Sequence, residues 1–167
     1  DATYMKVAVP SVTPPKFEMS DGVEAVPPNA LPNITHAEGE YVIVGAGKTA
    51  IDSVLWLLGN HVAPEDITWI MPRDSWFLNR AMTQPGTKFR IGEHIEIISE
   101  CDSPEEVFDR LEATQHFWRL DKSVTPSMYR WATVSLPELE QLQRVKNVIR
   151  KGRVKRIEAS KIDLEQG

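Results

Sequence analysis

The feature that most constrains the fold of this chain is a glycine-rich turn that joins a short apolar run to an amphipathic segment. The run is Val42, Ile43 and Val44, which is typical of a buried parallel strand. After the turn, apolar residues recur at helical spacing; they are Ile51, Val54, Leu55 and Leu58. The order strand, glycine turn, helix predicts an α/β domain.

The turn, Gly45-Ala46-Gly47-Lys48-Thr49-Ala50, has the residues that a dinucleotide phosphate site requires. Gly45 permits a tight turn, and Gly47 lacks a Cβ, so backbone N–H groups can approach a pyrophosphate closely. Ala50 is the third small residue, which lets the helix pack against its strand. The helix dipole and the unpaired first N–H groups favour negative charge. These six residues are the predicted cofactor-binding turn, and a purely structural turn is the alternative.

The same string ends like the phosphate-binding loop of nucleotide triphosphatases, which are the nearest rival class. That loop requires a glycine five positions before the second glycine, and Val42 occupies this place. No apolar strand ending in aspartate follows to hold Mg²⁺. The sequence therefore disfavours a triphosphatase.

The loop after the second predicted strand indicates which nicotinamide cofactor is bound. Residues 67–71 form that strand, and Arg73 follows it. An acidic residue here binds the ribose 2′-hydroxyl of NAD, whereas an arginine accommodates the 2′-phosphate of NADP. Arg73 and Arg80, which we expect on the same loop, therefore favour NADPH over NADH. Asp74 would repel a phosphate if it pointed inward, unless it pairs with an arginine or caps the next turn.

The middle of the chain is predicted to be irregular at first and then helical. We expect no regular element over residues 76–91, with a turn at Pro85-Gly86. Residues 91–101 are expected to form a helix, although the same range also has the alternation of a strand. Ser103-Pro104-Glu105-Glu106 has the form of a capping box, which predicts a second helix.

The C-terminal part is predicted to be a capped helix followed by a hairpin. A second capping box begins at Ser135, and its helix is expected to continue to Gly152. The apolar face of this helix would consist of Leu139, Leu142, Val145 and Ile149. Two short strands are then expected around a turn near Ser160.

The N-terminal part is predicted to be a strand followed by a proline-rich arm. Residues 4–9 have strand character, and six of the twelve prolines then fall within residues 10–32. Proline fixes φ and lacks an N–H, so this stretch is expected to be an extended connector. Its apolar residues predict that it lies against a neighbouring surface; they are Val12, Phe17, Val23, Val26 and Leu31.

Composition argues against several classes of protein. The 167 residues can bury one core, and no apolar run approaches the roughly 20 residues of a membrane span. A net charge of -5 argues against a nucleic-acid binder, despite seven basic residues within 144–156. One cysteine and the lack of a signal-peptide pattern favour a reducing cytoplasm. The four histidines lack metal-ligand spacing, and no nucleophile and base accompany the turn.

Several strings resemble the NADPH-binding domain of flavin-dependent monooxygenases and related two-dinucleotide flavoproteins. GAGKTAID is similar to the GxGxS[GA]xD pattern of those families, with Thr49 at the hydroxyl position and Asp52 at the acidic one. DATY and the prolines after it resemble the linker from an FAD domain, and RVKRIEASKIDLEQG resembles the meander that leads back to it. DATYMKVAVPSVTPP, WIMPRDSWFLNR and ATVSLPELE also resemble a bacterial group of FAD- and NAD(P)-binding proteins.

This resemblance implies a Rossmann-like fold, with a three-layer parallel sheet, added helices and a C-terminal β-hairpin. Residues 1–40 would be the strand and connecting arm, residues 41–167 the NAD(P)-binding domain, and residues 81–134 an insertion specific to the bacterial group. The chain contains only one glycine fingerprint. FAD would therefore be held by an FAD domain of the same, longer parent chain.

The expected role is to present the nicotinamide of NADPH for hydride transfer to that flavin, with the cofactors supplying the chemistry. No side chain of this chain is assigned a catalytic role, and the piece alone should not complete a reaction. A stand-alone NAD(P)-binding sensor or interaction module is the first alternative. A structural Rossmann domain that binds nothing is the second.

Overall fold

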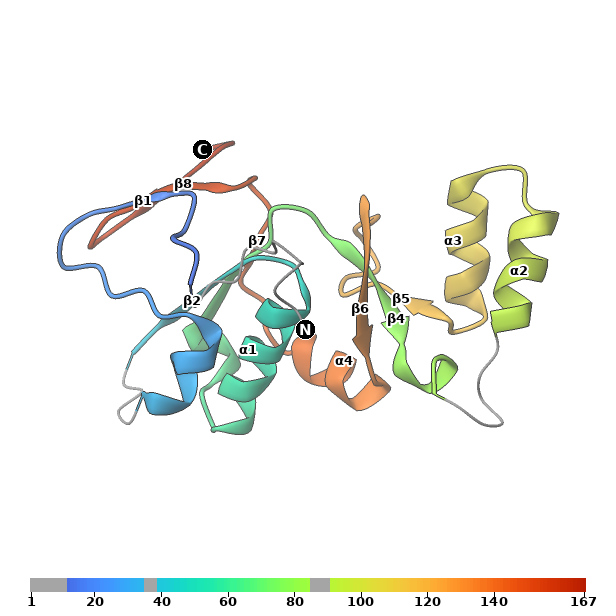
Figure 1. Ribbon diagram of the computed structural model, residues 1–167, viewed down its shortest axis with the longest axis horizontal. Helices are drawn as coiled ribbons and strands as arrows, with labels where there is room; N and C mark the ends of the chain where they lie inside the picture. The colour runs from blue at the N-terminus through green and yellow to red at the C-terminus, as the bar shows by residue number, and fades with distance from the viewer. Residues whose placement is uncertain (1–11, 35–38, 85–90) are drawn as a thin grey trace.

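The protein is a mixed α/β molecule with three small sheets (Figure 1). The computed structural model describes residues 12–34, 39–84 and 91–167. The strand predicted at residues 4–9 and the turn predicted at Pro85-Gly86 lie outside these ranges. Within the described residues, no helix is both long enough and apolar enough to cross a membrane.

The first sheet carries the glycine turn, and its three strands are all parallel in the order β2-β3-β7. The strands are β2 (Tyr41–Val44), β3 (Ile67–Ile70) and β7 (Val148–Ile149). The helix α1 (Lys48–Gly59) follows β2, and the 3-10 turn η3 (Pro64–Asp66) precedes β3. The predicted strand, turn, helix and second strand are thus confirmed, whereas a complete three-layer Rossmann sheet is not established by three strands.

The two faces of this sheet are covered differently. Trp69 belongs to the main core beneath α1, whereas Ile70 faces the opposite side. Val42 and Val44 remain 43% and 37% exposed. The prediction of a strand buried on both faces is therefore wrong for β2, because the described residues cover these two valines only in part.

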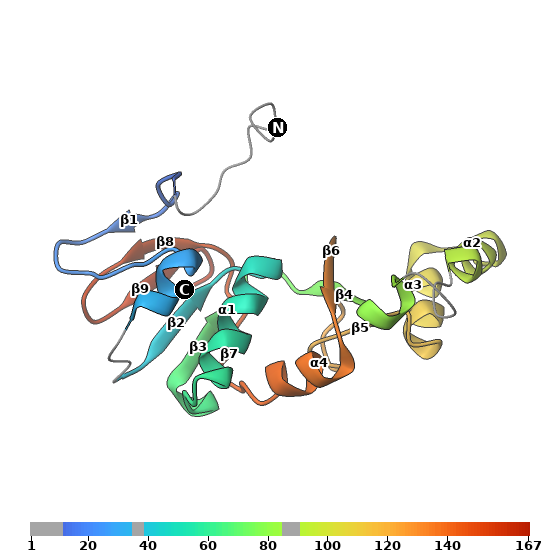
Figure 2. The same ribbon diagram turned by 60° about the horizontal axis from the view of Figure 1, so that its bottom comes forward.

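The second sheet, in the order β1-β8-β9, packs on that opposite side at β3 and β7 (Figure 2). Its strands are β1 (Glu18–Met19), β8 (Val154–Ile157) and β9 (Ile162–Leu164). The strands β8 and β9 are antiparallel, which confirms the predicted C-terminal hairpin. The arm contains the 3-10 helix η2 (Pro28–Asn33), and Leu31 of this helix is buried in the main core. The arm thus packs on the chain's own domain at Phe17 and Leu31, whereas the prediction is wrong for Val12 and Val26, which are exposed.

The third sheet, in the order β5-β4-β6, lies between α1 and two further helices (Figure 1). Its strands are β4 (Ser75–Asn79), β5 (Phe117–Trp118) and β6 (Met128–Val134). The 3-10 turn η4 (Arg80–Met82) follows β4, and the two helices are α2 (Ile91–Glu100) and α3 (Pro104–Ala113). Both helices confirm the predictions, and Ser103 caps α3 through the N–H of Glu106. The Glu106 carboxylate accepts from the Asp102 N–H instead of the Ser103 N–H, so the predicted capping box is incomplete.

The prediction that residues 76–91 are irregular is wrong, because β4 is a fully buried strand. Its side chains serve two separate cores. Phe77 belongs to the main core with α1, whereas Trp76 and Leu78 pack with Ile97 of α2 and Leu111 of α3. A strand that is apolar on both faces has no polar alternation, and so it lacks the usual strand signal.

The helix after Ser135 is shorter than predicted. The helix α4 (Leu136–Leu142) begins with a complete capping box between Ser135 and Glu138, as expected. It ends at Leu142 rather than near Gly152, and Val148 and Ile149 form β7 instead. These two β-branched residues pair with the open edge of β3, where they bond as a parallel strand.

Candidate functional site

The glycine turn is fixed onto the neighbouring strand by two hydrogen bonds at its first residue, one donated and one accepted by Gly45. The Gly45 N–H donates to the carbonyl of Ile70 at 2.9 Å, and the Trp69 indole N–H donates to the Gly45 carbonyl at 2.7 Å. Gly45 has a φ of 126°, a conformation that favours glycine. A Cβ at Gly45 would lie 3.7 Å from the Cβ of Ala50, which is itself buried. Both small residues therefore bring α1 close to β2.

The second glycine leaves open space in front of the helix. Gly47 is the N-cap of α1, with extended backbone, and no side chain caps the helix. A Cβ at Gly47 would meet nothing within 4 Å. Gly47 and Thr49 are exposed, and Ala46 is half-buried. The first N–H groups of α1 have no acceptor inside the helix, so they can receive an anion from this open side.

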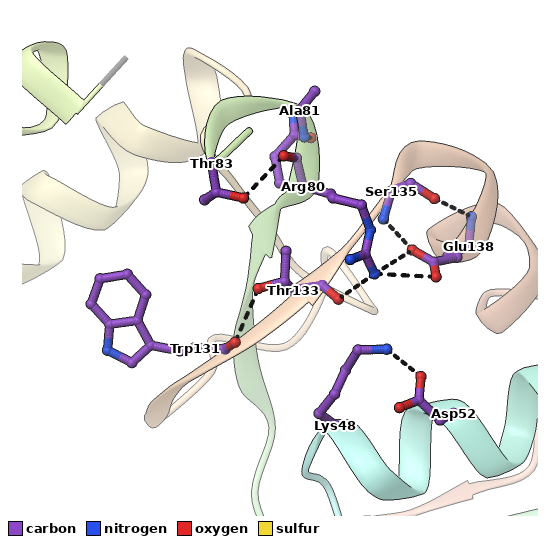
Figure 3. Close-up of polar contacts among 10 residues, drawn as sticks. Lys48, Asp52, Arg80, Ala81, Thr83, Trp131, Thr133, Ser135 and Glu138 are labelled. Carbon is purple, nitrogen blue, oxygen red and sulfur yellow. Dashed lines mark hydrogen bonds and ion pairs between the residues drawn. The ribbon is translucent and has the colours of Figure 1, made fainter. Parts of the chain in front are cut away.

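Lys48 is held along the helix instead of extending forward from the turn. Its ammonium group pairs with the carboxylate of Asp52, one turn further along α1 (Figure 3). The two side chains are 37% and 56% exposed. A pair this exposed is weak, so Lys48 can exchange Asp52 for another anion at little cost.

Arg73 leaves the sheet at the same edge as the glycine turn. Val44 and Ile70 are register partners in parallel strands, so the segments that follow them emerge side by side. Arg73 is exposed, and within the described residues its guanidinium makes no hydrogen bond or ion pair. Ligands of open α/β sheets bind at this carboxyl edge.

Asp74 points away from that edge and into the protein. Its carboxylate accepts two hydrogen bonds from Arg150, at 2.7 Å from Nε and 3.1 Å from Nη2. The Asp74 residue is only 6% exposed. Arg150 follows β7, the strand next to β3, and so the pair joins two strand ends. Of the orientations considered for Asp74, the structure shows pairing with an arginine.

Arg80 does not share a loop with Arg73, which corrects the prediction. The whole of β4 separates the two residues, and its five residues span about 17 Å. The Arg80 guanidinium donates to both carboxylate oxygens of Glu138 at 3.3 Å and to the Thr133 carbonyl at 3.2 Å (Figure 3). Arg80 therefore connects β4 to β6 and α4.

Glu138 combines two roles in this contact. Burial acts to raise its pKa, but hydrogen bonds from Ser135 and Arg80 outweigh burial and hold the pKa below the ordinary value of 4.5. The ionised carboxylate thus caps α4 and neutralises Arg80. A phosphate would have to compete with this carboxylate for Arg80.

Two contacts that shape this edge were not predicted from the sequence. The indole N–H of Trp69, on the buried strand β3, donates a hydrogen bond to the Gly45 carbonyl. Arg150 pairs with the Asp74 carboxylate and holds it away from the edge. Arg150 was visible only as one member of the basic run at 144–156. Neither contact has a local signal, because each partner lies more than twenty residues away.

The arrangement is suited to binding an anion. Open N–H groups and Arg73 offer donors at one sheet edge. No group of three or more metal-binding side chains occurs in the described ranges 12–34, 39–84 and 91–167.

The chain matches curated proteins of mycobacteria over its whole length. They include the uncharacterized protein Rv2000 of Mycobacterium tuberculosis strain H37Rv and the uncharacterized protein Mb2023 of Mycobacterium bovis. Each is 48% identical over 173 residues, which cover 100% of this chain and 32% of the relative. No protein-family model and no solved structure matches the chain. The chain thus spans about a third of the length of the curated relatives it matches.

Proposed function

We propose that this chain is the NADPH-binding part of a flavin-dependent oxidoreductase and presents the nicotinamide to an FAD held elsewhere in the protein. The observation that carries the proposal is the glycine turn. Gly45 holds a φ of 126°, Gly47 leaves the start of α1 open, and the turn lies at the carboxyl edge of parallel strands. A pyrophosphate at this place would accept hydrogen bonds from the free N–H groups, and the positive end of the helix dipole would stabilise its negative charge.

The preference for NADPH rests on Arg73. Its guanidinium has no partner among the described residues, and the neighbouring carboxylate of Asp74 is neutralised by Arg150. A 2′-phosphate at the end of β3 would therefore meet a free cation and no adjacent free carboxylate. Arginine also binds a phosphate through two parallel hydrogen bonds. Arg80 is not assigned this role, because it lies beyond β4 and its guanidinium is already paired with Glu138.

The proposal that FAD is held elsewhere in the protein rests on two observations. The chain has one glycine fingerprint, and its relatives are about three times as long. The resemblance to the NADPH domain of two-dinucleotide flavoproteins supports the proposal that FAD is bound by the remainder of the protein. In that arrangement hydride passes from the nicotinamide to the flavin, and this chain supplies binding and orientation.

The proposal is tested by calorimetric titration of NADPH and NADH into the full-length protein and three variants. Gly47→Val should abolish the binding of both cofactors, because a branched side chain fills the space that the pyrophosphate needs. Arg73→Ala should raise the Kd for NADPH about ten- to a hundredfold and leave NADH within about twofold. Arg144→Ala is the matched control, since this exposed arginine precedes β7 and lies toward the opposite sheet edge.

Three results would overturn parts of this proposal. If neither nucleotide binds at millimolar concentration to the folded protein, the glycine turn is structural. If Arg73→Ala weakens both nucleotides equally, the arginine does not bind the 2′-phosphate. If the full-length protein binds NADPH but contains no flavin, the sensor alternative is favoured, and the absorption spectrum of the purified protein decides this.

A further inference from the structure

A second surface of the molecule is apolar, exposed and distant from the glycine turn. It begins on α2, where Ile95 and Ile98 are 64% and 57% exposed while Ile97 is buried. Residues three apart lie on one face of a helix, so these two isoleucines form an outward stripe. The helix therefore has two apolar faces, and only one of them packs on its own domain.

A hollow of about 360 Å³ continues this stripe between α2 and α3. Its wall is largely apolar, and it is lined by Ile98, Cys101, Asp102, Ser103, Pro104, Val107 and Phe108. Ile98 belongs to both the stripe and the hollow. The two features are therefore parts of one surface.

Aromatic rings extend the same surface onto β6. The Phe108 ring contacts Tyr129, with 6.0 Å between centroids, and Tyr129 contacts Trp131 at 5.2 Å. Trp131 is 67% exposed and has a φ of 56°. It lies where the register between β4 and β6 shifts, which identifies a bulge. A bulky residue in this conformation is strained, and such strain is common at binding surfaces.

The part of this surface that α2 and α3 form is strongly acidic. Residues 91–113 contain eight acidic residues and one basic residue, Arg110. Arg110 pairs with Glu100. Among the described residues, Glu96 on α2 and Asp102 at the hollow have no ion-pair partner. The apolar stripe and hollow are thus bordered by free negative charge.

We propose that this surface, from Ile95 and Ile98 through the hollow to Trp131, docks a segment of the same polypeptide that lies outside these 167 residues. That segment would carry apolar side chains flanked by lysine or arginine. Tryptophan and tyrosine at a bulge are the residue types that dominate the energy of interfaces. The proposal does not depend on nucleotide binding.

Two observations favour this occupant over a second copy of the chain. The relatives continue for about twice the length of this chain beyond the matched region, so further polypeptide is available to cover the surface. A tethered segment also has a high effective concentration. In a two-fold dimer the same patch would meet itself, and that contact would bring two acidic segments together.

The first test is carbodiimide cross-linking of the full-length protein, which joins a carboxylate to a lysine in direct contact. We expect cross-links from Glu96 or Asp102 to a lysine outside residues 1–167, within one molecule. A mixture of isotopically light and heavy protein separates links within a molecule from links between copies. Links found only between copies, or only to lysines within residues 1–167, would overturn the proposal.

The second test measures whether Ile98 and Trp131 are covered together. Hydroxyl-radical oxidation of Trp131 in the full-length protein should rise at least about fivefold in Ile98→Glu, since the introduced charge opens the interface. Buried Trp69 reports that the protein stays folded. Leu136→Glu is the matched control, because Leu136 is 52% exposed but lies on α4, outside the surface. Equal oxidation of Trp131 in the wild type and Ile98→Glu, or protection that is lost on dilution, would reject the proposed occupant.

Discussion

The two ends of this molecule differ in how their sequence relates to their role. The glycine-turn unit, which is the sheet β2-β3-β7 with α1, has a local motif whose residues act through the backbone. The distal unit, which is the sheet β5-β4-β6 with α2 and α3, has no motif and instead exposes an apolar surface within an acidic segment. The first unit suggests a small anionic ligand, and the second suggests a polypeptide.

The strand β4 connects the two units, because its side chains enter both cores. It also bonds to β5 and β6, so the distal sheet is built around it. This shared strand makes it possible to ask whether the two units are one cooperative structure or two. The four changes below test the comparison, from the largest expected effect to the smallest.

The largest effect is expected from Phe77→Ala. Phe77 is fully buried in the main core, and truncation of such a ring costs about 3–5 kcal/mol of unfolding free energy. Because β4 is shared, hydrogen exchange should accelerate both in β3 and in α3. Denaturant titration and amide exchange measure these effects, and Leu136→Ala should change little. Unchanged protection of α3 would show instead that the distal unit folds on its own.

The second effect is expected from Asp74→Ala. This change leaves Arg150 without its buried partner and should lower the unfolding free energy by about 3 kcal/mol. Asp74 joins the ends of β3 and β7, so the loss lies within the glycine-turn unit. An effect below about 0.5 kcal/mol would mean that the bidentate pair adds no net stability.

Local motifs could be predicted from the sequence, whereas the ion pairs of Asp74 and Arg80 could not. The glycine turn, the complete capping box at Ser135 and the N-cap at Ser103 were predictable, because each depends on residues within a few positions of one another. The pairing of Asp74 with Arg150 spans 76 positions, and that of Arg80 with Glu138 spans 58. No local pattern encodes such distances. The expected role of Arg80 in cofactor binding therefore depended on a loop that is in fact a strand.

The end of α4 illustrates a different limit. Leu139, Leu142, Val145 and Ile149 have helical spacing, yet only the first two are in the helix. Val148 and Ile149 are also good strand residues, and the edge of β3 offers them backbone partners. Tertiary pairing overrides a periodicity that is ambiguous over so few residues. The same holds for β4, whose two buried faces remove the alternation.

The third effect concerns pH and Glu138. Its pKa in the folded protein lies below 4.5, so the ionised carboxylate contributes stability above that value. This contribution is lost as the pH falls through the depressed pKa. Glu138→Gln keeps a capping residue but removes the charge that faces Arg80, and should cost about 1 kcal/mol at neutral pH. Thermal unfolding between pH 7 and pH 3 measures it, and the difference between the two proteins should shrink toward pH 3. A constant difference would assign the effect to packing instead of charge.

The smallest effect on stability is expected from Asp52→Ala, which removes the exposed partner of Lys48. Such pairs within a helix contribute about 0.3–0.5 kcal/mol, so the unfolding free energy should change by no more than this. The ammonium group of Lys48 would then be free at the start of α1, close to the proposed pyrophosphate position. Because NADPH and NADH share the pyrophosphate, calorimetry should show the Kd of both falling by a similar factor, up to about threefold. Arg73→Ala should act on NADPH alone, so the two variants together separate the pyrophosphate from the 2′-phosphate. A gain for NADPH without a gain for NADH would place Lys48 near the 2′-phosphate and would contradict the assignment of that phosphate to Arg73 alone.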